Sequence, residues 1–172
     1  MSSETLLQEA QRKFAIQDIF LCDSKLWSSR KLGLGSPVTD PSVQFKLDEN
    51  NECSVVEAPG LDDAKIYGVQ YFVGTTVKIF SGQVRDNELA EDKLVATIAA
   101  TFLVRYVTDA SPSLEMLQAF NDNAVHHVWP FWREYIESAT TRLRVPTVVI
   151  PLRIAVPNKV PVEVPDDAEE KG

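Results

Sequence analysis

The stretch that decides how this chain folds is HHVWPFWREYI, residues 126–136. Four of its side chains are aromatic: Trp129, Phe131, Trp132 and Tyr135. Pro130 stands among them, and proline disrupts a helix interior because it has no amide hydrogen, although it suits a first turn. The run therefore predicts a kink or a restart at Trp129 and a helix from there to about Leu143. So many aromatic side chains form either hydrophobic core or a binding surface, and composition leaves both open.

The segments on either side of this helix have the patterns of β-strands. Residues 145–151 are β-branched and bounded by prolines, which predicts a short strand after the helix. Upstream, apolar residues alternate with polar ones over 43–47, 67–79 and 93–107, and aromatic and branched residues dominate 14–27. The two longest of these strands are joined by a loop without a helix, so we expect them to pair antiparallel.

Two further helix starts complete the expected order of elements. Residues 3–14 begin with Ser3 as a cap and end in basic side chains, which predicts a short, loosely docked helix. Ser111 as a cap and Pro112 at the first position open the helix that leads into the aromatic run. The order of helix, several strands, long kinked helix and short strand indicates the α+β class, with an antiparallel sheet covered on one face by helices.

The bulk composition excludes several classes of protein. With 172 residues, 44% of them hydrophobic, the chain is long enough for one domain with a core. A net charge of −8 argues against nucleic acid or an anionic membrane as the main partner. We find no signal-peptide core, and no apolar run approaches the roughly 20 residues that insert across a membrane. Two cysteines, Cys22 and Cys53, are too few for a disulfide framework, which predicts reduced thiols and a cytoplasmic location.

No pattern of catalytic or metal-binding residues stands out in the sequence. His126 and His127 are adjacent, whereas two metal ligands on a helix are usually three or four residues apart, so structural roles are favoured. The chain has no Gly-x-Ser-x-Gly turn for a nucleophile and no glycine-rich loop for phosphate. We therefore predict a protein that is not an enzyme and that needs no metal and no cofactor.

Two parts of the sequence resemble one known family. The run WPFWRE at 129–134, with Arg142 and Pro146 after it and a hydrophobic segment beyond, is similar to the C-terminal half of SecB-type chaperones. The run FAIQDIF at 14–20 resembles the first strand of the same family. Two separate matches in the right order are more specific than either alone, and the resemblance covers roughly residues 14–151.

The resemblance implies both a fold and a function. The fold is a SecB-like four-stranded antiparallel sheet with a long helix packed on it, formed by residues 14–156 between an N-terminal arm (1–13) and a disordered acidic tail (157–172). The assembly is a homotetramer, a dimer of dimers. The function is that of an ATP-independent chaperone, or holdase, which binds unfolded polypeptides in a hydrophobic groove. The groove residues that we expect are Trp27, Leu32, Leu34, Phe45, Tyr71, Trp129, Phe131 and Trp132.

Two kinds of client fit the resemblance. Export members of the family deliver preproteins to the SecA motor through acidic residues on the sheet; Asp23 matches one such position, but Trp27 falls at the next. Other SecB-like chaperones guard an aggregation-prone antitoxin, and the segments REYI (133–136) and TTRLRVP (140–146) look at least as much like those. The alternative from another class is a non-chaperone binding protein with one dedicated folded partner or a small apolar ligand.

Overall fold

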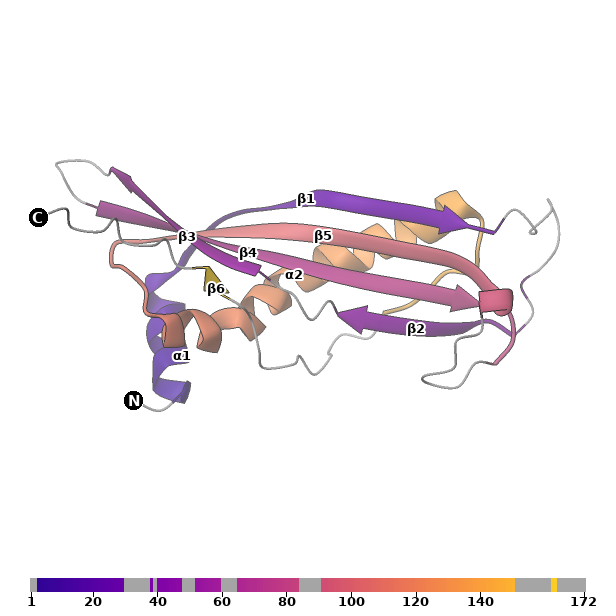
Figure 1. Ribbon diagram of the computed structural model, residues 1–172, viewed down its shortest axis with the longest axis horizontal. Helices are drawn as coiled ribbons and strands as arrows, with labels where there is room; N and C mark the ends of the chain where they lie inside the picture. Colours follow the sequence, from indigo (N-terminus) through magenta and orange to yellow (C-terminus); the bar gives the residue numbers. More distant parts are fainter. Residues whose placement is uncertain are drawn as a thin grey trace, which may run out of the picture.

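A computed structural model describes residues 3–29, 38, 40–47, 52–59, 65–83, 91–150 and 162–163, the last two by their backbone alone. In chain order its elements are α1 (Ser3–Lys13), β1 (Ala15–Ser28), β2 (Ser42–Leu47), β3 (Glu52–Pro59), β4 (Lys65–Phe80), the short 3-10 helix η2 (Glu91–Lys93), β5 (Leu94–Thr108), α2 (Leu114–Leu143) and β6 (Val162–Glu163). The strands form one sheet, and α2 crosses one of its faces (Figure 1). The expected α+β class, with an antiparallel sheet and a long helix packed on it, is confirmed.

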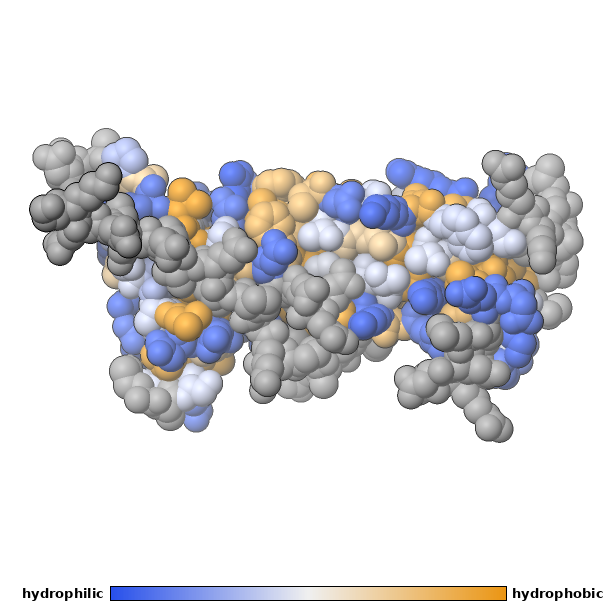
Figure 2. All heavy atoms as spheres, in the orientation of Figure 1, coloured by the Kyte–Doolittle hydropathy of each residue, from blue (hydrophilic) through white to orange (hydrophobic). Residues whose placement is uncertain are grey.

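The centre of the sheet is the antiparallel pair of its two longest strands. β4 and β5 pair from Tyr67 opposite Thr108 to Phe80 opposite Leu94, as the alternation of apolar residues predicts. Every second side chain of β4 from Val69 to Ile79 is buried beneath the helices. β1 pairs antiparallel with the outer side of β5 and forms one long edge of the sheet. Figure 2 shows apolar and hydrophilic side chains interspersed on the side of the molecule that faces the viewer.

The opposite edge of the sheet is a strand broken into two halves. β2 and β3 both pair antiparallel with β4, one after the other, so that Phe45 lies opposite Val77 and Cys53 opposite Tyr71. The antiparallel sheet is therefore four positions wide, with β2 and β3 sharing the last position. β6 adds a further strand, parallel to β3, and the order becomes β1-β5-β4-β3-β6. Residues 162–163 of the acidic tail thus form a strand within a segment that we expected to lack structure.

Helix α2 runs without interruption through the aromatic stretch. It begins after Ser113, whose hydroxyl accepts a hydrogen bond from the backbone N–H of Met116 at 3.2 Å, so the start expected at Ser111 is wrong by two residues. Pro130 lies inside the helix, and the expected restart at Trp129 is not found. Proline in a helix interior costs about 3 kcal/mol. Burying the side chains of Trp129 and Trp132 against the sheet offsets this cost, at roughly 1.5–3 kcal/mol for each large apolar side chain.

The expected strand at 145–151 is also wrong within its described part, residues 145–150. The chain leaves α2 at Arg144, whose left-handed conformation (φ 56°) ends the helix, and then runs back alongside β2 without joining the sheet (Figure 1). Val148 and Ile150 are buried, whereas Val149 is 80% exposed. The apolar run therefore packs by its side chains, and Pro146 lacks the amide hydrogen that strand pairing would use.

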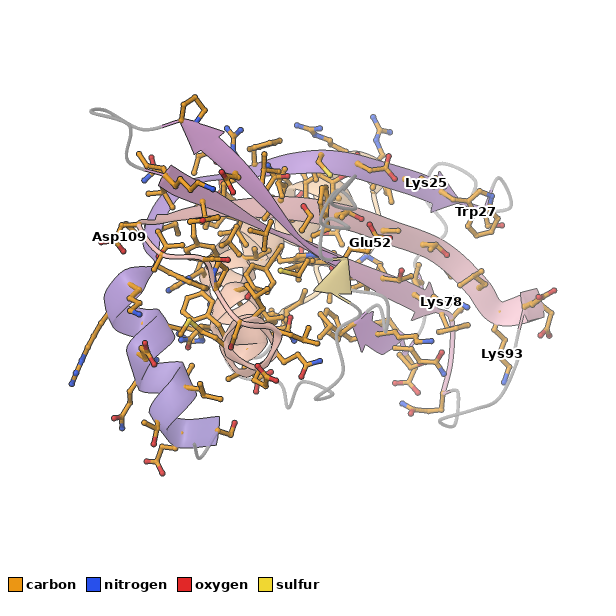
Figure 3. All side chains as sticks on the ribbon, turned by 60° about the vertical axis from the view of Figure 1, so that its left-hand side comes forward. Lys25, Trp27, Glu52, Lys78, Lys93 and Asp109 are labelled. Atoms are coloured by element: carbon orange, nitrogen blue, oxygen red, sulfur yellow. The ribbon has the colours of Figure 1, made fainter. Side chains whose placement is uncertain are left out.

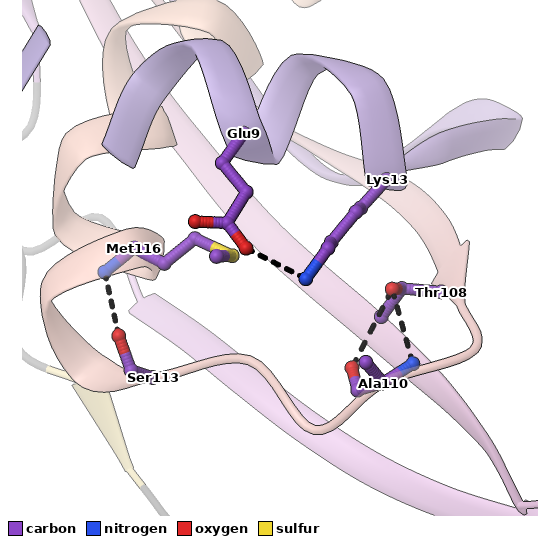
Figure 4. Close-up of polar contacts among 6 residues, drawn as sticks. All are labelled: Glu9, Lys13, Thr108, Ala110, Ser113 and Met116. Atoms are coloured by element: carbon purple, nitrogen blue, oxygen red, sulfur yellow. Dashed lines mark hydrogen bonds and ion pairs between the residues drawn. The ribbon is translucent and has the colours of Figure 1, made fainter. Parts of the chain in front are cut away.

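The N-terminal helix is confirmed, but the expected loose docking is wrong, since the helix packs on the start of α2. Ala10 is fully buried, and the ring of Phe14 meets that of Phe120 edge to face, with centroids 4.8 Å apart. An ion pair between Glu9 and Lys13 (2.7 Å) spans its exposed side (Figure 4). These contacts hold α1 at the end of the sheet opposite to β2 (Figure 1).

Candidate functional site

An open apolar pocket lies between β2 and the segment that follows α2. Its volume is about 330 Å³. The lining residues come from β2 and the residue before it, from the end of β4, and from residues 145–150 after α2, called here the returning segment. They are Pro41, Val43, Phe45, Val77, Ile79, Pro146, Thr147, Val148, Val149 and Ile150. All of these except Thr147 are apolar, so the pocket is suited to bury the side chains of an apolar ligand or polypeptide.

Local sequence patterns on two distant segments build this pocket. On β2, strand alternation places Val43 and Phe45 on the helix-covered face, opposite Ile79 and Val77 of β4. On the other side, the turn at Arg144 brings the returning segment alongside. Two side chains stay open to solvent at the pocket, Val43 at 44% and Val149 at 80% exposure. Apolar side chains exposed in this way are free to contact a partner.

The predicted groove residues Phe45, Trp129 and Trp132 do come together, but in different roles. Phe45 lines the pocket and is half-buried, and its ring meets Trp129 at 5.4 Å and Trp132 at 5.9 Å, both edge to face. The two tryptophans lie beneath it, with exposures of 6% and 0%. Our expectation that both lie at the surface is wrong, because the uninterrupted helix turns them toward the sheet.

Tyr71 is likewise a core residue. It is fully buried in the middle of β4, and its hydroxyl donates a hydrogen bond to the carbonyl of Leu117 at 2.9 Å. This bond ties the sheet to the first turn of α2. In this conformation Tyr71 is therefore inaccessible to a client, and its contribution is to hold the helix in place.

The remaining predicted residues lie elsewhere or outside the described part. Trp27 is 49% exposed near the end of β1 (Figure 3). Trp27 and Asp23 lie on the helix-free face of the sheet, because their β5 partners Thr97 and Thr101 alternate with the buried residues. Phe131 is 42% exposed on α2, with its ring 6.5 Å from that of Phe102 on β5, which is toward β1 and away from the pocket. Leu32 and Leu34 lie outside the described residues.

Sequence reasoning missed several pocket residues, notably Val43, Val148, Val149 and Ile150. The sequence does contain a signal for these residues, since the apolar segments 43–47 and 145–150 can both be recognised in it. What the sequence lacked was any indication that these segments, about a hundred residues apart, face each other.

Burial shifts the pKa of three titratable side chains beside the core, Cys53, Tyr71 and His127. Burial raises the pKa of the Cys53 thiol to about 12, and burial likewise holds the pKa of the Tyr71 hydroxyl far above its usual range, so both stay protonated at neutral pH. Burial, helped by the neighbouring His126, lowers the pKa of His127, whose Nδ1 lies 2.7 Å from the hydroxyl oxygen of Tyr106. This hydrogen bond joins α2 to β5.

Among the residues whose placement is given, no group of three or more His, Cys, Asp or Glu side chains is arranged to hold a metal ion. In the same part of the chain, no helix has the length and apolar character needed to cross a membrane.

Comparison with known proteins identifies the fold. No protein-family model matches the sequence, and no curated protein matches it either. Among solved structures, the chain is similar to the SecB-like chaperone Rv1957 of Mycobacterium tuberculosis, determined in complex with a ChAD peptide from the HigA1 antitoxin (Rv1956). The TM-score is 0.63 and the identity 17%, over 89% of this chain and 99% of that one. This protein therefore has the SecB-like fold.

Proposed function

We propose that this protein is an ATP-independent molecular chaperone, a holdase that binds unfolded polypeptide segments in the apolar pocket between β2 and residues 145–150. The observation that carries the proposal is the open apolar pocket of about 330 Å³ at a sheet edge, in a chain with the SecB-like fold. An unfolded client offers exposed apolar side chains and unpaired backbone groups. The pocket can bury the side chains, and the neighbouring strand edge can pair with the backbone.

The size of the pocket sets the expected strength of binding. A volume of about 330 Å³ is at the lower end for ligand sites and holds one or two large apolar side chains. Burying each contributes roughly 1.5–3 kcal/mol, and the entropy lost in ordering an extended segment offsets much of that gain. One segment should therefore bind weakly and with little sequence preference. Several such sites in one assembly would hold a long client much more firmly.

The exposed edge formed by β1 supports the proposal of a homotetramer, a dimer of dimers. On the helix-covered side of this edge, Ile16, Leu21, Leu26 and Phe131 are 48%, 40%, 40% and 42% exposed. A long apolar strand edge favours uncontrolled association unless something covers it. A second copy paired along β1 would bury this strip and leave the β2–β3 edges of both copies open to clients.

The client that we propose is an aggregation-prone antitoxin or an export preprotein in the cytoplasm, with the antitoxin favoured. The structural neighbour is a SecB-like chaperone in complex with an antitoxin peptide. Delivery to SecA through Asp23 is less favoured, because few free acidic groups surround it: Asp18 on the same face is paired with Arg105, and Lys25 is exposed nearby. The Asp18 pairing also lowers the pKa of that carboxyl, which keeps the ion pair intact at neutral pH.

The competing proposal is a binding protein with one dedicated partner or a small apolar ligand. The same pocket could serve it, since concave apolar sites of this kind hold small molecules as well as side chains. The two proposals differ in selectivity. A holdase protects many unfolded proteins from aggregation, whereas a dedicated module binds one molecule and protects none.

The test is to measure light scattering of an unfolded model protein during refolding, with and without this protein. We expect suppression of aggregation without ATP, and we expect Val149→Asp to weaken it several-fold while the melting temperature stays within about 2 °C of the unmodified protein. The charge-matched control is Ser138→Asp, at an exposed position on α2 that does not line the pocket. Absence of suppression, or equal loss in the two variants, would contradict a holdase acting at this pocket.

A further inference from the structure

The C-terminal strand β6 occupies a position at the edge where the groove lies. It pairs in parallel with β3, with Val162 opposite Cys53 and Glu163 opposite Ser54. β3 extends on to Pro59, and the part of it beyond Ser54 has no second strand beside it among the described residues. Within the described part of the chain, β6 therefore covers only the beginning of the β3 edge.

This pairing has the features of a contact that can be displaced. β6 is two residues long, and Pro161 and Pro165 flank it in the sequence. A ladder of two residues has few backbone hydrogen bonds, each worth roughly 0.5–1.5 kcal/mol net. So short a strand is released easily.

The pocket and β6 lie along one and the same edge of the sheet. β2 and β3 succeed each other beside β4, where Phe45 is opposite Val77 and Cys53 is opposite Tyr71. The six β4 residues that separate these two registers correspond to about 20 Å at roughly 3.3 Å per residue. An extended segment of about eight residues that fills the pocket and follows the edge toward β3 would reach the place of β6.

We propose that β6 is an internal competitor for the client, so that this strand gates the polypeptide-binding edge formed by β2 and β3. The inference rests on the proposed holdase function and names how the same site is regulated. The tail offers what a client offers, since valine occupies alternate positions 160, 162 and 164. The client that displaces it is an extended, apolar, proline-poor segment, whose ladder can continue along β3 where that of the tail stops.

The experiment compares the full chain with three variants. Val162→Pro with Val164→Pro removes backbone donors from the strand and keeps the charge of the tail, and a chain ending at Val156 removes the tail entirely. Asp166→Asn with Asp167→Asn is the matched control, because it changes charge but leaves the strand sequence intact. The probe is a fluorescein-labelled ten-residue peptide that alternates valine and threonine, and fluorescence anisotropy gives its dissociation constant. Circular dichroism verifies that each variant is folded.

A competitor that fills the edge for roughly two-thirds to nine-tenths of the time weakens a ligand about threefold to tenfold. We therefore expect the double-proline and shortened chains to bind the peptide about threefold to tenfold more tightly than the full chain. The control variant should stay within about twofold. A second peptide, in which prolines replace the threonines, should gain nothing from loss of the tail, since it cannot pair with the edge.

Two results would overturn the inference, and they are distinguishable. If all four proteins bind the first peptide equally, the tail does not compete and the holdase proposal still stands. If no form binds the peptide and none suppresses aggregation, the proposed function fails and the gating role fails with it.

Discussion

Replacing Trp132 with alanine should destabilise the protein strongly, because its side chain is a central part of the core. Trp132 is 0% exposed, and its ring packs edge to face against that of Phe45. Phe45 lines the pocket, and Trp132 lies beneath it. Trp→Ala substitutions in a core cost about 3–5 kcal/mol. The indole N–H of Trp132 has no hydrogen-bond partner in the described part of the chain, and an unpaired buried donor costs about 1–3 kcal/mol. We therefore expect a loss in the lower part of the range, about 3–4 kcal/mol.

The neighbouring Phe131 is the matched control for this prediction. It is the next residue along α2, it is also aromatic, and it is 42% exposed. Phe131→Ala should cost only about 1–2 kcal/mol, since the ring is little more than half-buried and full burial of such a side chain contributes about 1.5–3 kcal/mol. Trp132→Phe should cost less than Trp132→Ala, because it keeps most of the ring volume and removes the unpaired donor.

The assay is urea unfolding followed by far-ultraviolet circular dichroism, at one protein concentration for all variants. If the same variants are unfolded by heat instead of urea, a loss of 3–4 kcal/mol corresponds to a fall in melting temperature of about 6–16 °C for a chain of this size. If Trp132→Ala costs less than about 1 kcal/mol while client binding is abolished, Trp132 is an accessible groove residue. The packing argument for α2 would then be wrong.

Three further predictions follow from individual contacts. Ser113→Ala removes the hydroxyl that caps α2 and should cost about 1 kcal/mol, whereas Ser113→Asn should restore most of it; equal stability of all three proteins would contradict the cap. Because the folded state lowers the pKa of His127, the unfolded state takes up its proton first as the pH falls below about 6.5; stability should therefore decline between pH 7 and 5, less steeply in His127→Gln, in urea titrations across this range. Cys22 is exposed and Cys53 is buried with a pKa of about 12, so a thiol reagent should modify Cys22 first and Cys53 only on unfolding, as mass spectrometry of the labelled peptides would reveal.

Much of the sheet was predictable because strand alternation is a local property. Apolar side chains at every second position of β4 and β5 identified both strands, their buried faces and their antiparallel pairing. The same reasoning predicted a half-buried strand at residues 43–47, and in the structure Phe45 of this strand lines the pocket. For residues in these strands, the alternation of apolar and polar neighbours along the chain already indicates which face of the strand is apolar.

The helix and the site could not be completed in the same way. Pro130 locally favours a helix start, yet the helix continues through it, since the side chains on either side of Pro130 gain more by packing on the sheet than the missing hydrogen bond costs. Residues 145–150 have strand composition but pack by their side chains alone. In both cases contacts with distant segments outweighed local preference.

By itself, then, the sequence determined the α+β class, the long strands and the aromatic content of the central helix, because these depend on composition and on a short period that can be counted. Only the tertiary structure decided that Trp132 and Tyr71 are core, that the pocket opens between β2 and the segment after α2, and that β6 lies on the same edge. The reason is physical: burial and access are set by which segments meet in space, and the residues that meet here are far apart in the chain.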